Sequence, residues 1–427
     1  MTSRKSYERI ILFSLWLLIF SASSQIMIIS PLLPVIGKQL SMPEVWQGWL
    51  VSAYAFMVGF FALVAGPISD RIGRRRILLL GTAAMTIALA LHSLAFSWQA
   101  LMLMRLLAGI AGGILSGSAV SYIGDYFPYE RRGWANGWIM SGAASGQIVG
   151  IPLGTILGEY FGFRIPFLMF AVTMGLTWLL IQKYVPQPPV QRSLHPVTVK
   201  SALTGYWAML RKMKVFAAVM AFFAMFVSVG LYVIYLPTWL METFSISGNQ
   251  IALMFMIGGI ANVITGPRMG KLSDQIGRRG LILFSCVGIA IIMFGTTFII
   301  RDFWIAYPLF FLTMMLVAMR VTPFQALLTA LESDEKRGML MSLSASIGQA
   351  GFGLGGALAG LTFASYGYTS NTLFASFFAI SAAFIIWKFI PEPPMNKLAT
   401  RSNDKNKRVK TFTGMATSAA AVNSREH

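Results

Sequence analysis

The sequence predicts an all-α integral membrane protein whose twelve transmembrane helices form two pseudo-symmetric six-helix bundles. Three observations predict this class. The chain has 427 residues, of which 56% are hydrophobic and only 11% charged, whereas soluble domains carry about 25% charged residues. Apolar runs of about twenty residues, each long enough to cross a bilayer, recur along the chain. Two short motifs also occur once in each half, which indicates a duplicated six-helix unit.

The apolar runs divide the chain into four parts. We predict an N-terminal bundle over 1–185, a cytoplasmic linker over 186–214, a C-terminal bundle over 215–390 and a basic cytoplasmic tail over 391–427. The polar composition of the tail is typical of a disordered segment. The predicted spans are 10–36, 45–67, 77–96, 99–123, 134–157, 163–185, 215–240, 249–270, 280–300, 304–328, 339–362 and 370–390.

The basic residues indicate which loops face the cytoplasm. Lys38, Arg164 and Arg301 lie in the odd-numbered connections. Arg105 and Arg320 lie inside spans. Every other Lys and Arg falls in or beside the even-numbered connections and the termini. Positively charged loops stay on the cytoplasmic side, so we expect both termini in the cytoplasm. We expect the protein to lie in the inner membrane of a bacterium. The net charge of +19 is then a topology signal and an attraction to anionic lipids, not a nucleic-acid surface.

The first span combines polar residues with two prolines. Gln25 lies in its apolar sequence, and Pro31 and Pro34 follow. Polar side chains in lipid are costly unless they face the bundle or a water-filled cavity. Proline leaves backbone carbonyls that neighbours or water must satisfy. We therefore predict a bendable helix with Gln25 toward a cavity. The nearby serines fit either that role or tight helix packing.

The loop between the second and third spans carries the first repeated motif. Residues 66–76 read GPISDRIGRRR, and residues 270–279, GKLSDQIGRR, repeat the spacing in the other half. A basic loop selected only for its charge would not explain the second copy. The residues that define the two copies are Gly66, Asp70, Arg71, Gly73, Arg74, Gly270, Asp274, Gly277 and Arg278. The pattern G-x-x-x-D-R-x-G-R-R resembles the signature loop of the major facilitator superfamily, and the resemblance covers nearly the whole chain.

The resemblance implies two parallel six-helix halves that alternate access to a site between them. It also implies that the motif loops are conformational gates. Asp70 would meet the N-terminus of the eleventh helix, where the helix dipole favours a negative charge. Asp274 would play a weaker paired role, because Gln275 replaces the arginine found at Arg71.

A second marker supports the duplication. Residues 130–133 read ERRG after the fourth span, and residues 335–338 read EKRG after the tenth. The offset between these copies is almost the same as that between Asp70 and Asp274. Two independent markers with nearly one offset predict a repeated unit.

The fourth span places Arg105 ahead of Gly109, Gly112 and Gly113 on one helical face. This run resembles the fourth-helix motif of the superfamily, in which the arginine takes part in ion coupling. The alternative is an arginine that snorkels to the outer surface, about two turns away.

The fifth and eleventh spans are rich in glycine. The regularly spaced glycines are Gly142, Gly146, Gly150, Gly154, Gly351 and Gly355. Four-residue steps let two helices pack backbone to backbone. The fifth-span run also resembles the fifth-helix motif of the antiporters in this superfamily, although Ile151 separates Gly150 from Pro152. Packing alone would explain the glycines without any antiport.

The second half carries further candidates for a substrate or ion path. They are Tyr232 and Tyr235 in the seventh span, Asn262 in the eighth, Arg320 in the tenth and Gln349 in the eleventh. Arg320 lies near mid-membrane depth, where an arginine costs at least ~2.5 kcal/mol. Snorkelling is difficult from that depth, so we predict a cavity role for this residue.

The acidic residues set the expected charge of the cavity. None of the fifteen lies at the middle of a span, so Arg105 and Arg320 would make the cavity electropositive. Such a cavity favours neutral or anionic cargo over cations. His92 is the only histidine in a span; it is either a proton carrier or a structural residue.

These features predict a secondary active transporter for a small organic solute. The chain resembles the twelve-helix drug–proton antiporters, which implies efflux coupled to protons; the alternative is an importer or facilitator of an organic anion. We expect a monomer among membrane lipids, without cofactor, metal or nucleic acid. We do not expect an enzyme, because the sequence shows no nucleotide-binding loop, metal-ligand cluster or Ser-His-Asp arrangement. The single cysteine excludes an intramolecular disulfide.

Overall fold

The computed structural model describes residues 2–188, 199–332 and 334–392. Within these residues the chain is helical and has no strand. Twelve helical segments are long and apolar enough to cross a membrane, and each overlaps one of the predicted spans. The all-α membrane class is therefore confirmed. The predicted tail lies almost wholly outside the described residues.

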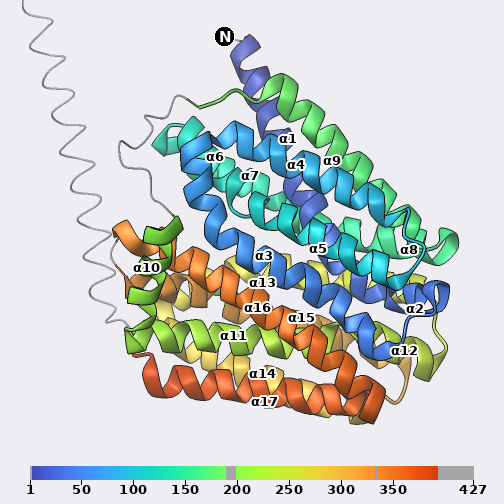
Figure 1. Ribbon diagram of the computed structural model, residues 1–427. Helices are drawn as coiled ribbons and strands as arrows, with labels where there is room; N and C mark the ends of the chain where they lie inside the picture. Colours follow the sequence, from blue (N-terminus) through green and yellow to red (C-terminus); the bar gives the residue numbers. More distant parts are fainter. Residues whose placement is uncertain (1, 189–198, 333, 393–427) are drawn as a thin grey trace, which may run out of the picture.

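The first six spanning segments form one group and the last six another, and the groups lie side by side in Figure 1. The first group consists of α1 (Thr2–Met27), α2 (Ile29–Leu40), α3 (Glu44–Ile72), α4 (Arg74–His92), α5 (Trp98–Leu115), α6 (Ser118–Tyr126), α7 (Tyr129–Ser145), the π-helical turn η1 (Gly146–Gly150), α8 (Ile151–Phe161) and α9 (Arg164–Tyr184). The second consists of α11 (Met213–Val233), α12 (Leu236–Phe244), α13 (Gly248–Ile276), α14 (Arg278–Ile299), the 3₁₀ turn η2 (Phe303–Ile305), α15 (Ala306–Leu331), α16 (Asp334–Tyr366) and α17 (Tyr368–Phe389).

The first spanning segment of each half is interrupted. The break between α1 and α2 falls at Ile28, and the break between α11 and α12 falls just before Pro237. Proline has no N–H and fits the first turn of a helix. The two breaks face each other, because the Ser30 hydroxyl donates to the carbonyl oxygens of Val233 (2.7 Å) and Ile234 (2.9 Å).

Helices α3 and α16 form the closest seam between the halves. A Cβ atom added to Gly48 would lie 2.1 Å from the carbonyl oxygen of Gly356, so only glycine fits there. The Ser52 hydroxyl donates to the Gly353 carbonyl at 2.6 Å. Small residues allow such close approach of two backbones in a membrane.

The fifth spanning segment, formed by α7, η1 and α8, packs on α1 through its glycines. A Cβ atom at Gly142 would lie 2.5 Å from the Trp16 carbonyl oxygen, and one at Gly150 would lie 2.0 Å from the Ser24 hydroxyl oxygen. Gly150 is the last residue of the π turn η1, in which the helix widens. The glycine contacts therefore hold this segment against the first helix both before the turn and at its end.

The two predicted gate loops lie at the junction of α3 with α4 and at the junction of α13 with α14. Gly73 and Gly277 have φ angles of +102° and +98°, a conformation that favours glycine. Arg74 pairs with Asp125 at 2.7 Å, and Arg278 pairs with Asp274 at 2.9 Å. The side chains of Asp70 and Arg71 lie outside the described part of the structure, as does the environment of Gly66, so the contact of Asp70 with the eleventh helix stays a prediction.

The linker contains a helix that the sequence analysis did not predict, α10 (Val199–Leu210). Its Tyr206 hydroxyl donates to the carbonyl of Leu63 in α3 at 3.3 Å. Tyr206 and Met209 also pack in one apolar cluster with Leu340 and Leu343 of α16. The linker helix thus contacts both halves at the end of the α3–α16 seam that carries Leu63 and Leu340 (Figure 1).

Candidate functional site

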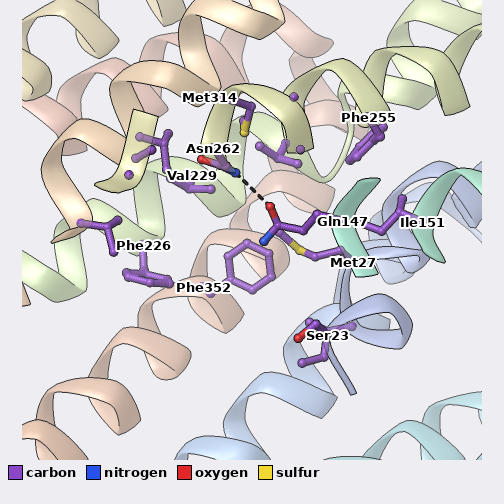
Figure 2. A pocket seen from close by; sticks show the side chains of 18 of the residues that line it. Ser23, Met27, Gln147, Ile151, Phe226, Val229, Phe255, Asn262, Met314 and Phe352 are labelled. Carbon is purple, nitrogen blue, oxygen red and sulfur yellow. Dashed lines mark hydrogen bonds between the residues drawn. The ribbon is translucent and has the colours of Figure 1, made fainter. Parts of the chain in front are cut away.

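A cavity of about 450 Å³ lies between the two halves. Its walls come from α1, η1 and the start of α8 in the first half, and from α11, α13, α15 and α16 in the second. Figure 2 shows side chains from both halves around the cavity. Small-molecule sites in proteins commonly measure about 300–1,000 Å³, so the cavity has the size for one organic solute.

Most of the wall is apolar. The larger apolar side chains in the lining are Met27, Ile151, Met225, Phe226, Val229, Phe255, Phe310, Met314 and Phe352. Phenylalanine rings offer broad apolar contacts, and methionine adapts to irregular shapes. Such a surface can hold apolar bodies of more than one shape.

A hydrogen bond between two amide side chains crosses the cavity from one half to the other. The Asn262 side chain on α13 donates to Gln147 Oε1 in η1 at 3.1 Å (Figure 2). A Cβ atom at Gly259 would lie 3.1 Å from the Gln147 carbonyl carbon, so the small residue makes room for the π turn. The sequence predicts Asn262 as a candidate site residue but not Gln147, because the glycine spacing around Gln147 indicates packing alone.

Arg320 on α15 belongs to the cavity lining, although the residue is only 1% exposed. Its Nη2 donates to the Met225 carbonyl at 3.1 Å, and its Nη1 lies 3.9 Å from the Cys286 sulfur. Its Nε has no hydrogen-bond partner within the described part of the chain. No carboxylate pairs with Arg320 among the residues that the structure describes. Gln349 on α16 also lines the cavity.

Arg105 and Gln25 lie away from the cavity, in a network inside the first half. Arg105 donates through Nε to the Leu50 carbonyl at 3.1 Å and through Nη1 to Gln25 Oε1 at 3.2 Å. Gln25 donates to the Tyr54 hydroxyl at 2.8 Å, and the Arg105 guanidinium lies 4.4 Å from the centre of the Tyr54 ring. Arg105 is completely buried, so its side chain does not snorkel to the surface.

His92 and Tyr232 are also buried outside the cavity lining. His92 Nδ1 lies 2.6 Å from the Ala88 carbonyl oxygen, and its ring packs 4.6 Å from that of Phe167. The Tyr232 hydroxyl accepts a hydrogen bond from Thr296 at 3.2 Å. In this conformation neither side chain reaches a solute in the cavity.

Tyr235 joins the two halves at the ends that the charge pattern predicts to face the outside. Its hydroxyl accepts from the Gly48 N–H at 2.8 Å and donates to the Glu44 carbonyl at 2.6 Å. A second link lies nearby in the fold, where the Glu159 carboxylate accepts the Gly248 N–H at 2.5 Å. We call these two links the outer clamp. Both links join the first half to the second.

Comparisons with known proteins agree with this architecture. The sequence profile of the Major Facilitator Superfamily matches residues 15–327 and 238–422. The multidrug resistance protein MdtG of Proteus mirabilis is 26% identical over 391 residues, which cover 89% of this chain and 94% of that protein. An uncharacterized MFS-type transporter of Bacillus subtilis, YceJ, is 25% identical over 82% of this chain and 89% of its own. The crystal structure of a D-xylose–proton symporter superposes with a TM-score of 0.74 at 19% identity, covering 91% of this chain and 99% of that one.

Proposed function

The chain belongs to the major facilitator superfamily, a family of membrane transporters, and from this premise we propose that it exports small organic solutes in exchange for protons. The cavity between the halves carries the proposal, since it has the size of a solute and its walls belong to both halves. Rocking the halves against each other would expose such a site to one side at a time. Relatives named multidrug resistance proteins support export, and so does the resemblance of the glycine run in the fifth segment to the antiporter motif.

Import or facilitated passage of an organic anion is the second candidate function. Arg320 favours it, because a cationic side chain lines the cavity and no acidic residue does so among the residues described. The D-xylose–proton symporter shares the fold and does not decide the direction. The two candidates therefore differ in the direction of flux rather than in the site.

The coupling path is part of the proposal. Arg105 and His92 are our candidates for it, because the described spans hold no carboxylate at mid-depth. Asp70 and Asp274, with their motif loops, are the proposed gates at the cytoplasmic face. We further propose that the protein acts as a monomer in a bacterial inner membrane with both termini in the cytoplasm.

Inside-out membrane vesicles test the direction of transport. Respiration acidifies their interior, and a fluorescent acridine reports the pH gradient. A solute exported in exchange for protons should partly collapse the gradient when it is added outside, whereas vesicles without the protein should not respond. Accumulation only in right-side-out vesicles would instead establish import. A broad panel of solutes that moves in neither preparation would contradict the proposed function.

Asp70→Asn provides a matched variant for the same assay. The substitution keeps the size of the side chain and removes its charge, so the proposed attraction to a helix N-terminus weakens. We expect normal membrane insertion with slower transport, while Asp302→Asn, at the outer surface, should transport at the wild-type rate. Equal rates for all three proteins would refute the gate assigned to Asp70.

A further inference from the structure

The charge of the cavity wall is unbalanced. Arg320 is the one cationic side chain among the described residues of the lining, and no acidic side chain accompanies it there. Its backbone partner at Met225 satisfies one nitrogen, and the Cys286 sulfur is a weak, distant partner. A buried charge without a counter-ion is costly, and Nε still lacks an acceptor. An anionic group in the cavity would supply the missing counter-charge.

The amide pair provides a second recognition element on the same cavity. Gln147 and Asn262 each have donor and acceptor groups, but the described contacts use only one hydrogen bond between them. Their remaining groups are available to polar atoms of a solute. The π turn that presents Gln147 is a feature often found at functional sites.

The apolar part of the cavity wall determines which kind of body the cargo carries beside its polar groups. Phenylalanine and methionine side chains dominate the lining, and the volume of about 450 Å³ exceeds what one acidic group would occupy. A cargo that matches this wall has an apolar body, commonly an aromatic one. A small inorganic anion would leave most of the apolar surface unused.

We propose that this cavity binds amphipathic organic anions, with the acidic group at Arg320, hydrogen-bonding atoms at Gln147 and Asn262, and an apolar body against the phenylalanine and methionine wall. The assignment rests on the proposed transport function but not on its direction. It names a substrate class for the site and excludes organic cations as preferred cargo. Binding at the amide pair would also compete with the hydrogen bond that links the two halves inside the cavity.

Three dansyl probes of nearly equal shape test the charge preference. They are dansylglycine, an anion; dansylglycinamide, its neutral analogue; and N-(2-aminoethyl)dansylamide, a cation. Fluorescence titration of the purified full-length protein in lipid nanodiscs measures each affinity without any gradient. We expect the anion to bind about ten-fold tighter than the neutral analogue, the ratio for one hydrogen bond to a charged group. The cation should bind most weakly.

Three variants separate the roles of the polar residues. Arg320→Gln should remove the preference for the anion, and Arg320→Lys should keep the order of the probes at reduced affinity. Asn262→Ala should lower the affinities for the anionic probe and the neutral probe by similar factors. Arg301→Gln, which removes an exposed arginine at the outer surface, serves as the matched control and should leave all affinities unchanged.

Several results would overturn the assignment: no binding of dansylglycine, equal affinity for the three probes, or an anion preference that persists in Arg320→Gln. If Arg320→Gln does not fold, loss of the probe order in Arg320→Lys would have the same consequence. Transport in vesicles distinguishes this inference from the proposed function. Flux of neutral or cationic solutes without anion binding would reject the inference alone. Anion binding without flux of any solute would reject the transport proposal alone.

Discussion

At the scale of single residues, the two intramembrane arginines have different surroundings. The sequence places both inside apolar spans and predicts a polar environment for each. The structure surrounds Arg105 with acceptors and an aromatic ring inside one half, and places Arg320 on the cavity wall. Depth in the membrane follows from sequence position, but the neighbours of a side chain depend on helix rotation and packing, which a local pattern does not specify.

Gln25 connects the Arg105 network, because it accepts from Arg105 and donates to Tyr54. The substitution Gln25→Ala leaves the Arg105 guanidinium and the Tyr54 hydroxyl buried without this hydrogen-bond partner. The loss lowers the free energy of unfolding by about 1–3 kcal/mol. We therefore expect a lower thermal unfolding temperature for the purified protein. Gln25→Glu should unfold closer to wild type, since a carboxylate can accept from both the guanidinium and the Tyr54 hydroxyl. Unchanged unfolding of Gln25→Ala would mean that water replaces the side chain.

At the scale of elements, the fifth segment shows what periodicity reveals and what it hides. Four-residue glycine spacing indicates helix packing, and Gly142 and Gly150 lie against α1 in the structure. The π turn η1 is not visible in the spacing, because one widened turn changes the helical register without a distinctive sequence. That is why Gln147, which the turn carries, was not recognised as a cavity residue. The prolines of the first span indicate a bend in that helix. No local pattern indicates that Ser30 forms a hydrogen bond with the opposite half.

Two glycines of α7 provide a matched test of packing. A methyl group at Gly142 would meet the backbone of Trp16, which cannot move independently of its helix, whereas one at Gly137 meets nothing within 4 Å. Gly142→Ala should therefore destabilise the protein by about 1–3 kcal/mol, the range for overpacking. Gly137→Ala should be neutral or slightly stabilising, because alanine favours helix. Thermal unfolding of both variants decides, and equal unfolding temperatures would contradict the packing of α7 on α1.

At the scale of the whole molecule, the sequence predicts the number, order and orientation of the helices, because hydropathy, charge asymmetry and the repeated motifs are all local features. It does not predict which contacts join the two halves. Those contacts form between residues far apart in the chain, such as Tyr235 with Glu44 and Gly48. The two arrangements of an alternating-access carrier differ by only a few kcal/mol, so a few such contacts decide between them.

Tyr235→Phe tests the outer clamp with the least disturbance. The substitution removes the hydroxyl and its two hydrogen bonds to the opposite half, and it keeps the ring, which stacks on Phe363 at 4.8 Å. Two hydrogen bonds contribute about 2 kcal/mol together, which corresponds to a shift of about thirty-fold in the equilibrium. The variant should therefore populate conformations with an open outer side.

Spin labels at Lys38 and Thr243, both exposed near the outer ends of α2 and α12, report that opening as a distance distribution. Cys286 is buried, so it does not compete for the labels. We expect one short distance in the otherwise unmodified protein and an added longer population in Tyr235→Phe. Tyr366→Phe, a change at a tyrosine that is 79% exposed, should match the unmodified distribution. If Tyr235→Phe matches it as well, the hydroxyl does not hold the halves together, and this role falls to other contacts such as that of Glu159 with Gly248.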